Sequence, residues 1–349
     1  MIGPSRNFRC QAVRCLAAIF FGALTGQSLR AQIAVSSITT SVTNLANTAT
    51  NGTTFQNDTA AVTSFKDVAG NIYDTNTVAG AAYVRRNTAA GNATNASVWY
   101  AEGTSATQFS ASYASTYSSL LLGNNIYRGA DNVFSNGTTV SDGNIERIDF
   151  VFSATGITAT SNTSFAIFDR GLLNAHDAVK IAVITGWNSG TNTATAYGGN
   201  MVGVTAANYG SANVVANFTY NLFRYSNSDN LGSPYWSINS ETGSQGIGGT
   251  VISMSDLGIA AGTTIYGYSL MAADVTNGGS MANLVDWTNS TYYATNTSTA
   301  GGVDLSAVNG VLYNRRAPES STYGALFIGL TALALGWRRY RRGLSAPGA

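Results

Sequence analysis

The stretch Val215-Ala-Asn-Phe-Thr-Tyr-Asn-Leu-Phe223 is the part of the sequence that decides the fold class. Its apolar and polar side chains alternate, with Ala216, Phe218, Tyr220 and Leu222 on one side and Asn217, Thr219 and Asn221 on the other. Successive side chains of a β-strand point to opposite faces of a sheet, so a period of two indicates a strand with one buried face. We therefore predict a β-strand here.

A second stretch, Ile145 to Phe152, alternates in the same way. Ile148, Phe150 and Phe152 fall on one side, and Arg147 and Asp149 fall on the other. Further strands are predicted at residues 165–168, 179–185, 201–205, 250–254 and 264–271. Turn signals lie between these strands, at Asn136-Gly137, Asp142-Gly143, Gly198-Gly199 and Asn277-Gly278-Gly279.

The composition of the central part of the chain supports the same fold class. It is rich in Thr, Ser, Asn, Gly, Val and Tyr, and poor in Lys, Glu and Leu, which favours strands over helices. Short strands at this spacing predict an all-β fold, and we favour a β-sandwich of jelly-roll type. A barrel and a β-solenoid are the alternatives, although the sequence lacks the fixed repeat that a solenoid requires.

The N-terminal residues 1–31 have the pattern of a secretory signal peptide. Arg6, Arg9 and Arg14 precede an apolar run at residues 15–24, and small and polar residues follow. We expect cleavage between Ala31 and Gln32. Residues 32–97 then form a Ser/Thr/Asn/Gly-rich lead-in, which is β-structured or partly disordered, and residues 98–313 form the β-sandwich body.

The C-terminal residues combine a polar motif, an apolar run and a basic cluster. The motif is Pro318-Glu319-Ser320-Ser321-Thr322, and the basic cluster contains Arg338, Arg339, Arg341 and Arg342. A helix of roughly 20 apolar residues crosses a bilayer, and basic residues stay on the cytoplasmic side. We therefore predict a linker and motif at 314–319, a transmembrane helix at 320–337 and a basic cytoplasmic tail at 338–349.

This tail resembles the PEP-CTERM domain, a bacterial C-terminal sorting signal, over about residues 317–342. Pro318 and Glu319 match the Pro-Glu-Pro motif of that family, whereas Ser320 replaces its second proline. The resemblance implies processing by exosortase, a membrane-embedded transpeptidase-like enzyme. It also implies passage through the inner membrane to the cell envelope or surface, with the chain anchored at least transiently.

The body is also similar, in short phrases, to stretches of large bacterial surface proteins that are rich in β structure. These phrases are Asn144-Ile-Glu-Arg-Ile-Asp149, Phe168-Asp-Arg-Gly171 followed by His176-Asp177, Ile265-Tyr-Gly-Tyr-Ser-Leu270, and Leu284-Val-Asp-Trp-Thr288. The resemblance implies an exported module and brings no chemistry with it.

Charge and cysteine content agree with a location outside the cell. Cys10 and Cys15 both lie in the expected signal peptide, so the mature chain would form no disulfide. Between Gln32 and Asn314, eight basic residues stand against sixteen acidic ones, a net charge of about −8. This acidic charge disfavours nucleic acid as a partner.

The sequence gives little support for catalysis or for a metal. His176 is the only histidine and lacks a Gly-x-Ser-x-Gly motif, so we expect a loop histidine that bonds to backbone. Glu146 and Asp149 are three residues apart on a predicted strand and point to opposite faces. No zinc site is expected. Calcium could bind at residues 229–233 or at Asp131-Asn132, although turn chemistry also explains these residues.

The tryptophans offer a different kind of site. Trp99, Trp187, Trp236 and Trp287 could form a platform on which sugars stack, or they could pack in the core.

We expect an exported, non-enzymatic envelope or matrix protein of structural or adhesive type, whose partners are exosortase, the membrane and extracellular polysaccharide. The alternative is an extracellular protein that binds or cleaves carbohydrate.

Overall fold

The computed structural model describes residues 32–41, 60–86, 96–100, 108–109, 121–134, 145–225, 236–294, 302–317 and 328–338. Over these residues the secondary structure is mostly strand, so the predicted all-β class is confirmed. The longest continuous part, residues 145–225, contains both stretches in which the alternation is clearest.

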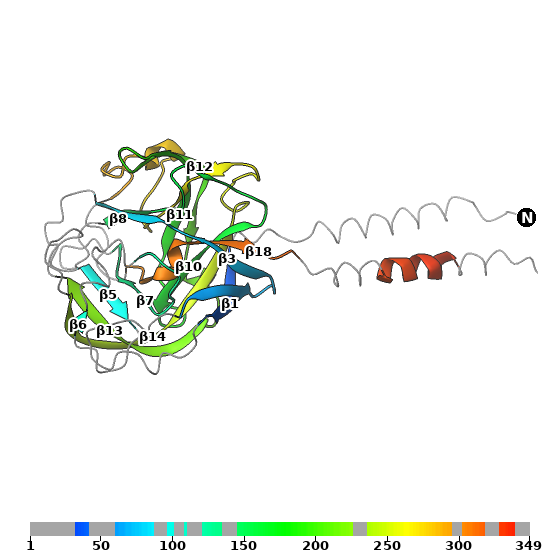
Figure 1. The fold of residues 1–349 in the computed structure, drawn as a ribbon, viewed down its shortest axis with the longest axis horizontal. Coiled ribbons are helices and arrows are strands. Elements are labelled where there is room, and N and C mark those ends of the chain that lie inside the picture. Colours follow the sequence, from blue (N-terminus) through cyan, green and yellow to red (C-terminus); the bar gives the residue numbers. More distant parts are fainter. Residues whose placement is uncertain are drawn as a thin grey trace, which may run out of the picture.

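Six strands close into a barrel. In order around the ring they are β1 (Ile33–Thr40), β2 (Val62–Asp67), β3 (Ile72–Val78), β18 (Val311–Arg315), β10 (Thr163–Gly171) and β14 (Trp236–Ser253). Each strand pairs with the next in antiparallel fashion, and the pairing of β1 with β14 closes the ring. This closed ring is a barrel, which we predicted as an alternative to the favoured β-sandwich (Figure 1).

A second sheet of five strands lies beside the barrel (Figure 1). Its order is β12 (Thr193–Val204), β11 (Val179–Asn188), β16 (Gly267–Ala272), β8 (Ile145–Val151) and β4 (Ala81–Arg86). The barrel sheet is extended by β5 (Ala96–Tyr100), β6 (Gln108–Phe109), β7 (Arg128–Asp131), β13 (Val215–Tyr225) and β17 (Leu305–Ser306). A small pair joins β9 (Ile157–Thr158) to β15 (Thr264–Ile265), and short 3-10 turns lie at η2 (Ala206–Tyr209), η3 (Met281–Leu284) and η4 (Ala307–Gly310).

Strand β10 separates two hydrophobic cores. Its Ala166 and Phe168 belong to the core inside the barrel, which draws side chains from all six strands of the ring. Phe165 and Ile167, which alternate with them, belong to the core between the barrel wall and the five-stranded sheet. Because consecutive side chains of a strand point to opposite faces, one strand serves both cores. The five-stranded sheet therefore packs against the outside of the barrel wall.

The strand predicted at Val215 to Phe223 is confirmed, with one local error. β13 places Tyr220 and Leu222 in the barrel core, as predicted. Ala216, predicted on the same buried face, is exposed, because the pairing of β13 with β14 shifts register between Val215 and Phe218. A bulge of this kind turns the following residues to the other face.

The turn signals have different outcomes. The predicted turn at Asn277-Gly278-Gly279 is confirmed, and both of its glycines have positive φ angles. The predicted turn at Gly198-Gly199 is wrong, because both residues lie inside β12, where pairing with β11 shifts register and Gly199 has a φ of 66°. The signals at Asn136-Gly137 and Asp142-Gly143 lie outside the described residues.

The chain enters and leaves the barrel at the same rim, which we call the entry rim. Val35 of β1 is paired with Asp67 of β2, and the Arg316 amide, just after β18, donates to the Ile72 carbonyl at the start of β3 (2.8 Å). The strands from the expected lead-in, β1 to β4, belong to the same two sheets as the strands of the expected body. The opposite end of the barrel, where β10 ends at Gly171, is the far rim.

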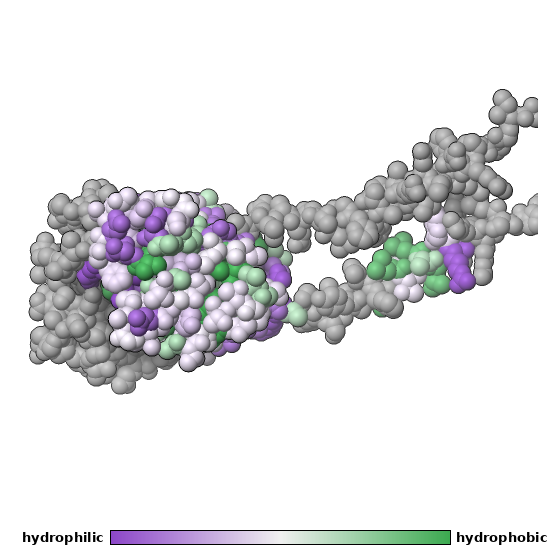
Figure 2. Space-filling view, turned by 90° about the horizontal axis from the view of Figure 1, so that it is seen from above, coloured by the Kyte–Doolittle hydropathy of each residue, from purple (hydrophilic) through white to green (hydrophobic). Residues whose placement is uncertain are grey.

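The C-terminal residues are described in part. Residues 328–338 form a helix whose side chains are all exposed, and Figure 2 shows it as mainly hydrophobic with a hydrophilic end. Among the described helices, none combines the length and apolar character needed to cross a membrane. The predicted helix at 320–337 is therefore described only from residue 328 onwards and stays a prediction.

Most of the predicted sorting residues lie outside the described ranges, namely Ala31, Pro318, Glu319, Ser320, Ser321, Thr322, Arg339, Arg341 and Arg342. Two are described. Arg338 is the last residue of the exposed helix, and the Gln32 side chain donates from Nε2 to the Gly203 carbonyl (2.7 Å).

Close strand contact at Gly267 gives a test of the fold. A Cβ atom on Gly267 would lie 1.9 Å from the Phe150 carbonyl oxygen, whereas one on Gly203 would meet nothing within 4 Å. Gly267→Ala must push β16 away from β8, and we expect it to lower the free energy of unfolding by about 1–3 kcal/mol. Urea unfolding measures the change. Gly203→Ala is the matched control, and equal losses in the two variants would contradict the packing described.

Candidate functional site

Two clusters of charged side chains are buried in this otherwise weakly charged body. The sheet cluster lies on the outer face of the five-stranded sheet and centres on Asp149 with Arg85 and Arg147. The far-rim cluster lies where β10 ends and consists of Asp131, Asp169, Arg170, His176 and Asp304. Each of the four phrases noted in the sequence supplies residues to one of these clusters.

Strand alternation builds the sheet cluster. Tyr83 and Arg85 of β4, Arg147 and Asp149 of β8, and Ser269 of β16 all point to the outer face, as the sequence predicted for Arg147 and Asp149. Arg85 stands directly opposite Arg147 in the β4–β8 pairing. Like charges placed opposite each other destabilise a sheet unless a counter-charge lies between them. Asp149 supplies that counter-charge.

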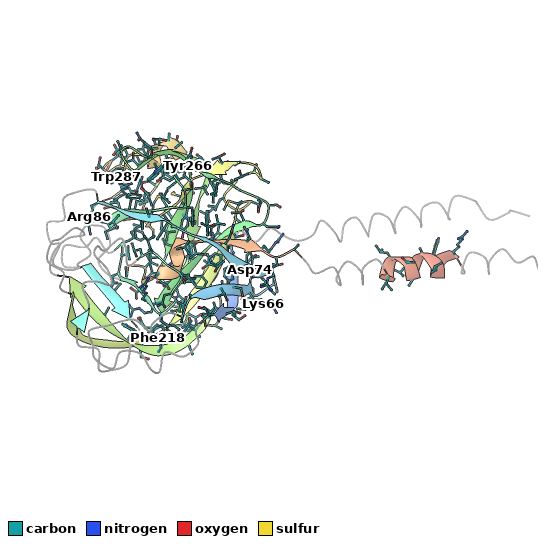
Figure 3. The ribbon with its side chains drawn as sticks, viewed as in Figure 1. Lys66, Asp74, Arg86, Phe218, Tyr266 and Trp287 are labelled. Carbon is teal, nitrogen blue, oxygen red and sulfur yellow. The ribbon has the colours of Figure 1, made fainter. Side chains whose placement is uncertain are left out.

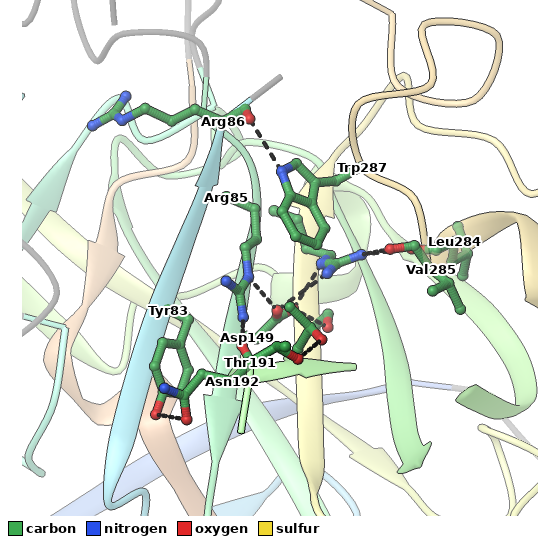
Figure 4. Close-up of polar contacts among 12 residues, drawn as sticks. Tyr83, Arg85, Arg86, Asp149, Thr191, Asn192, Leu284, Val285 and Trp287 are labelled. Carbon is green, nitrogen blue, oxygen red and sulfur yellow. Dashed lines mark hydrogen bonds and ion pairs between the residues drawn. The ribbon is translucent and has the colours of Figure 1, made fainter. Parts of the chain in front are cut away.

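The carboxylate of Asp149 is fully buried and closely surrounded by donors (Figure 4). It accepts hydrogen bonds from Arg85 Nε (2.8 Å) and from Ser269 Oγ (2.6 Å), and it lies 2.7 Å from Arg147 Nε. Burial acts to raise the pKa of Asp149, but the attraction of Arg147 and Arg85 outweighs it, so the pKa is lowered. Asp149 is therefore held ionised and is unsuited to give or take protons near neutral pH.

A segment of the chain, residues 281–294, covers the sheet cluster. Arg147 Nη1 donates to the Leu284 carbonyl (2.5 Å) and to the Tyr293 hydroxyl (3.3 Å). The ring of Trp287 lies 4.9 Å from the guanidinium carbons of both Arg85 and Arg147, and its Nε1 donates to the Arg86 carbonyl (3.1 Å). The two arginines thus hold the covering segment onto the sheet through cation–π contacts and hydrogen bonds.

The hairpin that connects β11 and β12 also contacts the sheet cluster, through Asn192. Arg85 Nη2 donates to the Asn192 carbonyl, and the Tyr83 hydroxyl donates to Asn192 Oδ1 (3.0 Å). The ring of Trp187, near the end of β11, lies 5.4 Å from the ring of Tyr83. The hairpin therefore reaches across the sheet from β11 to its edge strand, β4.

The far-rim cluster joins three segments that are distant in sequence. Arg170 Nη2 donates to Asp304 Oδ2 (2.7 Å) and to Asp131 Oδ1, and its guanidinium carbon lies 3.6 Å from the centre of the Tyr220 ring. Asp169, on the opposite face of β10, accepts from the Asp304 amide (2.7 Å). Adjacent residues on one strand therefore both fix the segment around Asp304.

His176 is held by two acceptors. Its Nδ1 faces Asp169 Oδ2 at 3.1 Å, and its Nε2 faces Asn213 Oδ1 at 2.8 Å. Asn213 Nδ2 donates to the Gly171 carbonyl, which fixes the orientation of this amide. Each ring nitrogen therefore faces an oxygen, an arrangement that suits the doubly protonated form of the ring. Burial acts to lower the pKa of His176, but the hydrogen bond and charge of Asp169 raise it overall.

The contacts of His176 differ in part from those predicted, and they explain why residue 248 is a glycine. His176 lies in a loop, as predicted, but its bonds go to side chains and not to backbone, so that part of the prediction is wrong. No local pattern in the sequence points to Asn213, which lies 37 residues from His176. A Cβ atom on Gly248 would lie 2.4 Å from His176 Nε2, so the imidazole needs a glycine at that position.

Among the described residues, the two clusters contain most of the buried charged side chains. Both nitrogens of His176 face Asp169 or Asn213, so in the described part of the chain neither faces a hydroxyl nucleophile. Glu146 and Asp149 both lie on β8 and both side chains are buried. Among the described residues, the buried charges of the two clusters hold separate segments in place.

The candidate metal positions behave as follows. Among the described residues, no group of three or more His, Cys, Asp or Glu could hold a metal ion. The calcium candidate Asp131 belongs to the far-rim cluster, where Arg170 and Asn132 Nδ2 (2.8 Å) both bond to its carboxylate. The other calcium candidate, residues 229–233, lies outside the described ranges.

The tryptophans divide into two groups. Trp187 and Trp287 lie half-buried beside the sheet cluster, whereas the side chains of Trp99 and Trp236 are not among those described. Sequence reasoning missed Tyr83 and Arg85, which lie next to them. The alternation Ala82-Tyr83-Val84-Arg85 is a strand signal that would have placed both on one face.

Comparison of the chain with protein-family models, with curated proteins and with solved structures found no match. The proposals that follow therefore rest on the residues and on their geometry.

The sheet cluster predicts a large effect of one carboxylate. Asp149→Asn leaves two buried guanidinium groups without their counter-charge, and we expect it to lower the free energy of unfolding by about 3–5 kcal/mol. Asp74→Asn is the control, because Asp74 pairs with Arg316 at an exposed site and should cost at most about 1 kcal/mol. Urea unfolding of the two variants decides, and a loss for Asp149→Asn no larger than the control would refute the role assigned to this ion pair.

The far-rim cluster predicts that stability falls as the pH rises. The pKa of His176 is raised from 6.5, so its contribution is complete below that value and is lost as the pH rises through the folded-state pKa. Burial also raises the pKa of Asp169, and that of Asp177 to about 6 from 3.8, so the folded chain binds more protons than the unfolded chain at mildly acidic pH. His176 and Asp177 therefore make the protein more stable near pH 5 than near pH 8, and the raised pKa of Asp169 also favours the folded state at lower pH.

Asp169→Asn tests this pH dependence. The substitution removes the charge that raises the pKa values of both His176 and Asp177, so it should flatten the curve of melting temperature against pH between about 6 and 8. It should also lower the melting temperature at every pH, because Asp169 accepts three hydrogen bonds. A slope unchanged from the parent protein, or a melting temperature that rises toward pH 8, would contradict the assignment.

Proposed function

We propose that the chain is an exported, non-catalytic envelope protein of structural or adhesive type, sorted by an exosortase-type enzyme through its PEP-CTERM-like tail. The observation that carries this proposal is the common rim at which the chain enters and leaves the barrel. A body connected in this way can be attached through its C-terminal segment while its far rim and outer sheet stay free. Its partners would be the sorting enzyme, the membrane and extracellular polysaccharide.

The entry rim is reinforced where the chain leaves it. Arg316 donates from Nε and Nη2 to the two carboxylate oxygens of Asp74 on β3, both at 2.6 Å. Two parallel bonds fix the direction of the exit more firmly than one bond would. Figure 3 shows Asp74 and Lys66 at one end of the body, and Arg86 and Trp287 toward the other. The residues around the sheet cluster therefore lie away from the point of attachment.

The fate of the two ends follows from the sequence. In this proposal residues 1–31 are removed during export, and residues 320–337 lie in the membrane with Arg338, Arg339, Arg341 and Arg342 on the cytoplasmic side. Large apolar side chains exposed on the helix at 328–338, including Leu330, Leu333 and Trp337, support a membrane environment for this segment. The body would be a two-layered sandwich in which the barrel wall forms one layer.

A non-catalytic role is supported by what the buried charges contact. Asp149, Asp169 and Arg170 are each tied to partners that hold separate segments together. Reactive groups in enzymes need a pKa near the working pH and a free side toward a substrate. The carboxylate of Asp149 has neither property, since it is buried and its pKa is lowered.

The sorting motif gives the direct test of this proposal. Replacing Pro318 and Glu319 by alanine should abolish processing and reduce delivery of the body to the cell surface. Ser320→Pro is the matched variant, because it restores the Pro-Glu-Pro pattern and should make processing at least as efficient. Surface labelling and the electrophoretic mobility of the chain report delivery and processing. Normal delivery and mobility after loss of both residues would remove the main support for the proposal.

A carbohydrate-binding or carbohydrate-cleaving protein is the second candidate. The half-buried rings of Tyr83 and Trp187, which lie close together on the outer face, favour it, because exposed aromatic rings stack on the apolar faces of sugars. Release of reducing sugar from polysaccharide would show cleavage, and binding without release would support recognition alone.

A further inference from the structure

We propose that the surface formed by Tyr83, Arg85, Trp187 and Asn192 binds a saccharide that carries a carboxylate group. We call this surface the aromatic–arginine patch. The inference deepens the proposed function and rests on it only for the extracellular origin of the ligand. It names both the class of ligand and the residues that would contact it.

The patch provides rings for the apolar face of a sugar. The Tyr83 and Trp187 rings lie 5.4 Å apart and are inclined by 40°, and both side chains remain partly exposed. The Tyr83 ring is held in place, because its hydroxyl donates to Asn192 Oδ1. Rings that are already ordered lose little entropy on binding.

The patch also provides a cation at a defined position. The Arg85 guanidinium lies 5.1 Å from the Tyr83 ring centre and 4.9 Å from that of Trp287, and the side chain is 11% exposed. Its Nε is bonded to Asp149 and its Nη2 to the Asn192 carbonyl, while Nη1 makes no hydrogen bond to a described residue. A guanidinium held between rings is pre-organised to bond a carboxylate through its remaining donors.

Charge distinguishes carboxylate-bearing saccharides from neutral saccharides and from long polyanions as ligands of this patch. Arg85 is the cation that the patch presents, because Arg147 is fully buried against Asp149 and Figure 4 shows the Arg86 side chain directed away from Arg85. The body as a whole carries about −8, so a long polyanion such as nucleic acid would be repelled. A short uronate oligosaccharide, with one carboxylate on each sugar ring, can place one carboxylate at the positive charge of Arg85 and carries far less charge than a long polyanion. This complementarity favours a uronate-bearing oligosaccharide over a neutral one.

Calorimetry with the purified full-length chain in detergent micelles tests the inference, with trigalacturonate and neutral galactotriose as probes. We expect trigalacturonate to bind about tenfold more tightly, as one charge-assisted hydrogen-bonded contact implies, and to bind more weakly at high salt. Trp187→Ala should abolish this binding, whereas Tyr83→Phe, which keeps the ring, should retain most of it. Equal affinity for the two sugars, no binding of either, or tighter binding of single-stranded DNA would overturn the inference.

Two controls keep the result interpretable. The melting temperature of Trp187→Ala shows whether the body is intact, and if the variant unfolds, Trp187→Phe with a smaller expected loss replaces it. The variant in which Pro318 and Glu319 are alanine should bind trigalacturonate like the parent chain. Failure of sorting and failure of ligand binding are therefore separate outcomes, since the first is measured on cells and the second on purified protein.

Discussion

The structure depends on burying both faces of β10. Its Phe168 packs inside the barrel against Phe65, and its Phe165 packs on the other side against Tyr268 of the five-stranded sheet. A strand with both faces in apolar surroundings loses water from every side chain, and each buried aromatic side chain contributes on the order of 2–3 kcal/mol. Because β10 contributes side chains to both cores, it holds the sheet and the barrel together.

The same strand explains why charged groups are buried at its end. Asp169 and Arg170 continue the alternation of β10 past its apolar residues, so they reach the far rim on opposite faces. Both must find partners there, since an unpaired buried charge costs several kcal/mol. Their partners come from the segments around Asp304 and His176, which are thereby fixed to the barrel. The sheet cluster repeats this logic on β8 with Arg147 and Asp149.

Local alternation predicted much of this fold, because strands reveal themselves over a few residues. The stretch from Ile145 to Phe152 was placed with the correct faces, and so was most of Val215 to Phe223. Ring closure could not be predicted, since it depends on pairings such as β1 with β14, whose residues are more than 200 positions apart. The contacts within the sheet cluster could likewise be predicted only in part. Arg147 and Asp149 were placed on one face, but their contacts with Leu284 and Trp287 are set by the tertiary fold.

We propose that the two charge clusters are permanent structural connections between separate segments of the chain. Native-state hydrogen exchange with mass spectrometry tests it by comparing the segments at residues 172–178 and 281–293 with β10. If the clusters hold these segments to the body, their amides should exchange only with an opening free energy close to that of β10. Exchange through a local opening of much lower free energy, as in a lid that opens over an active site, would contradict the claim.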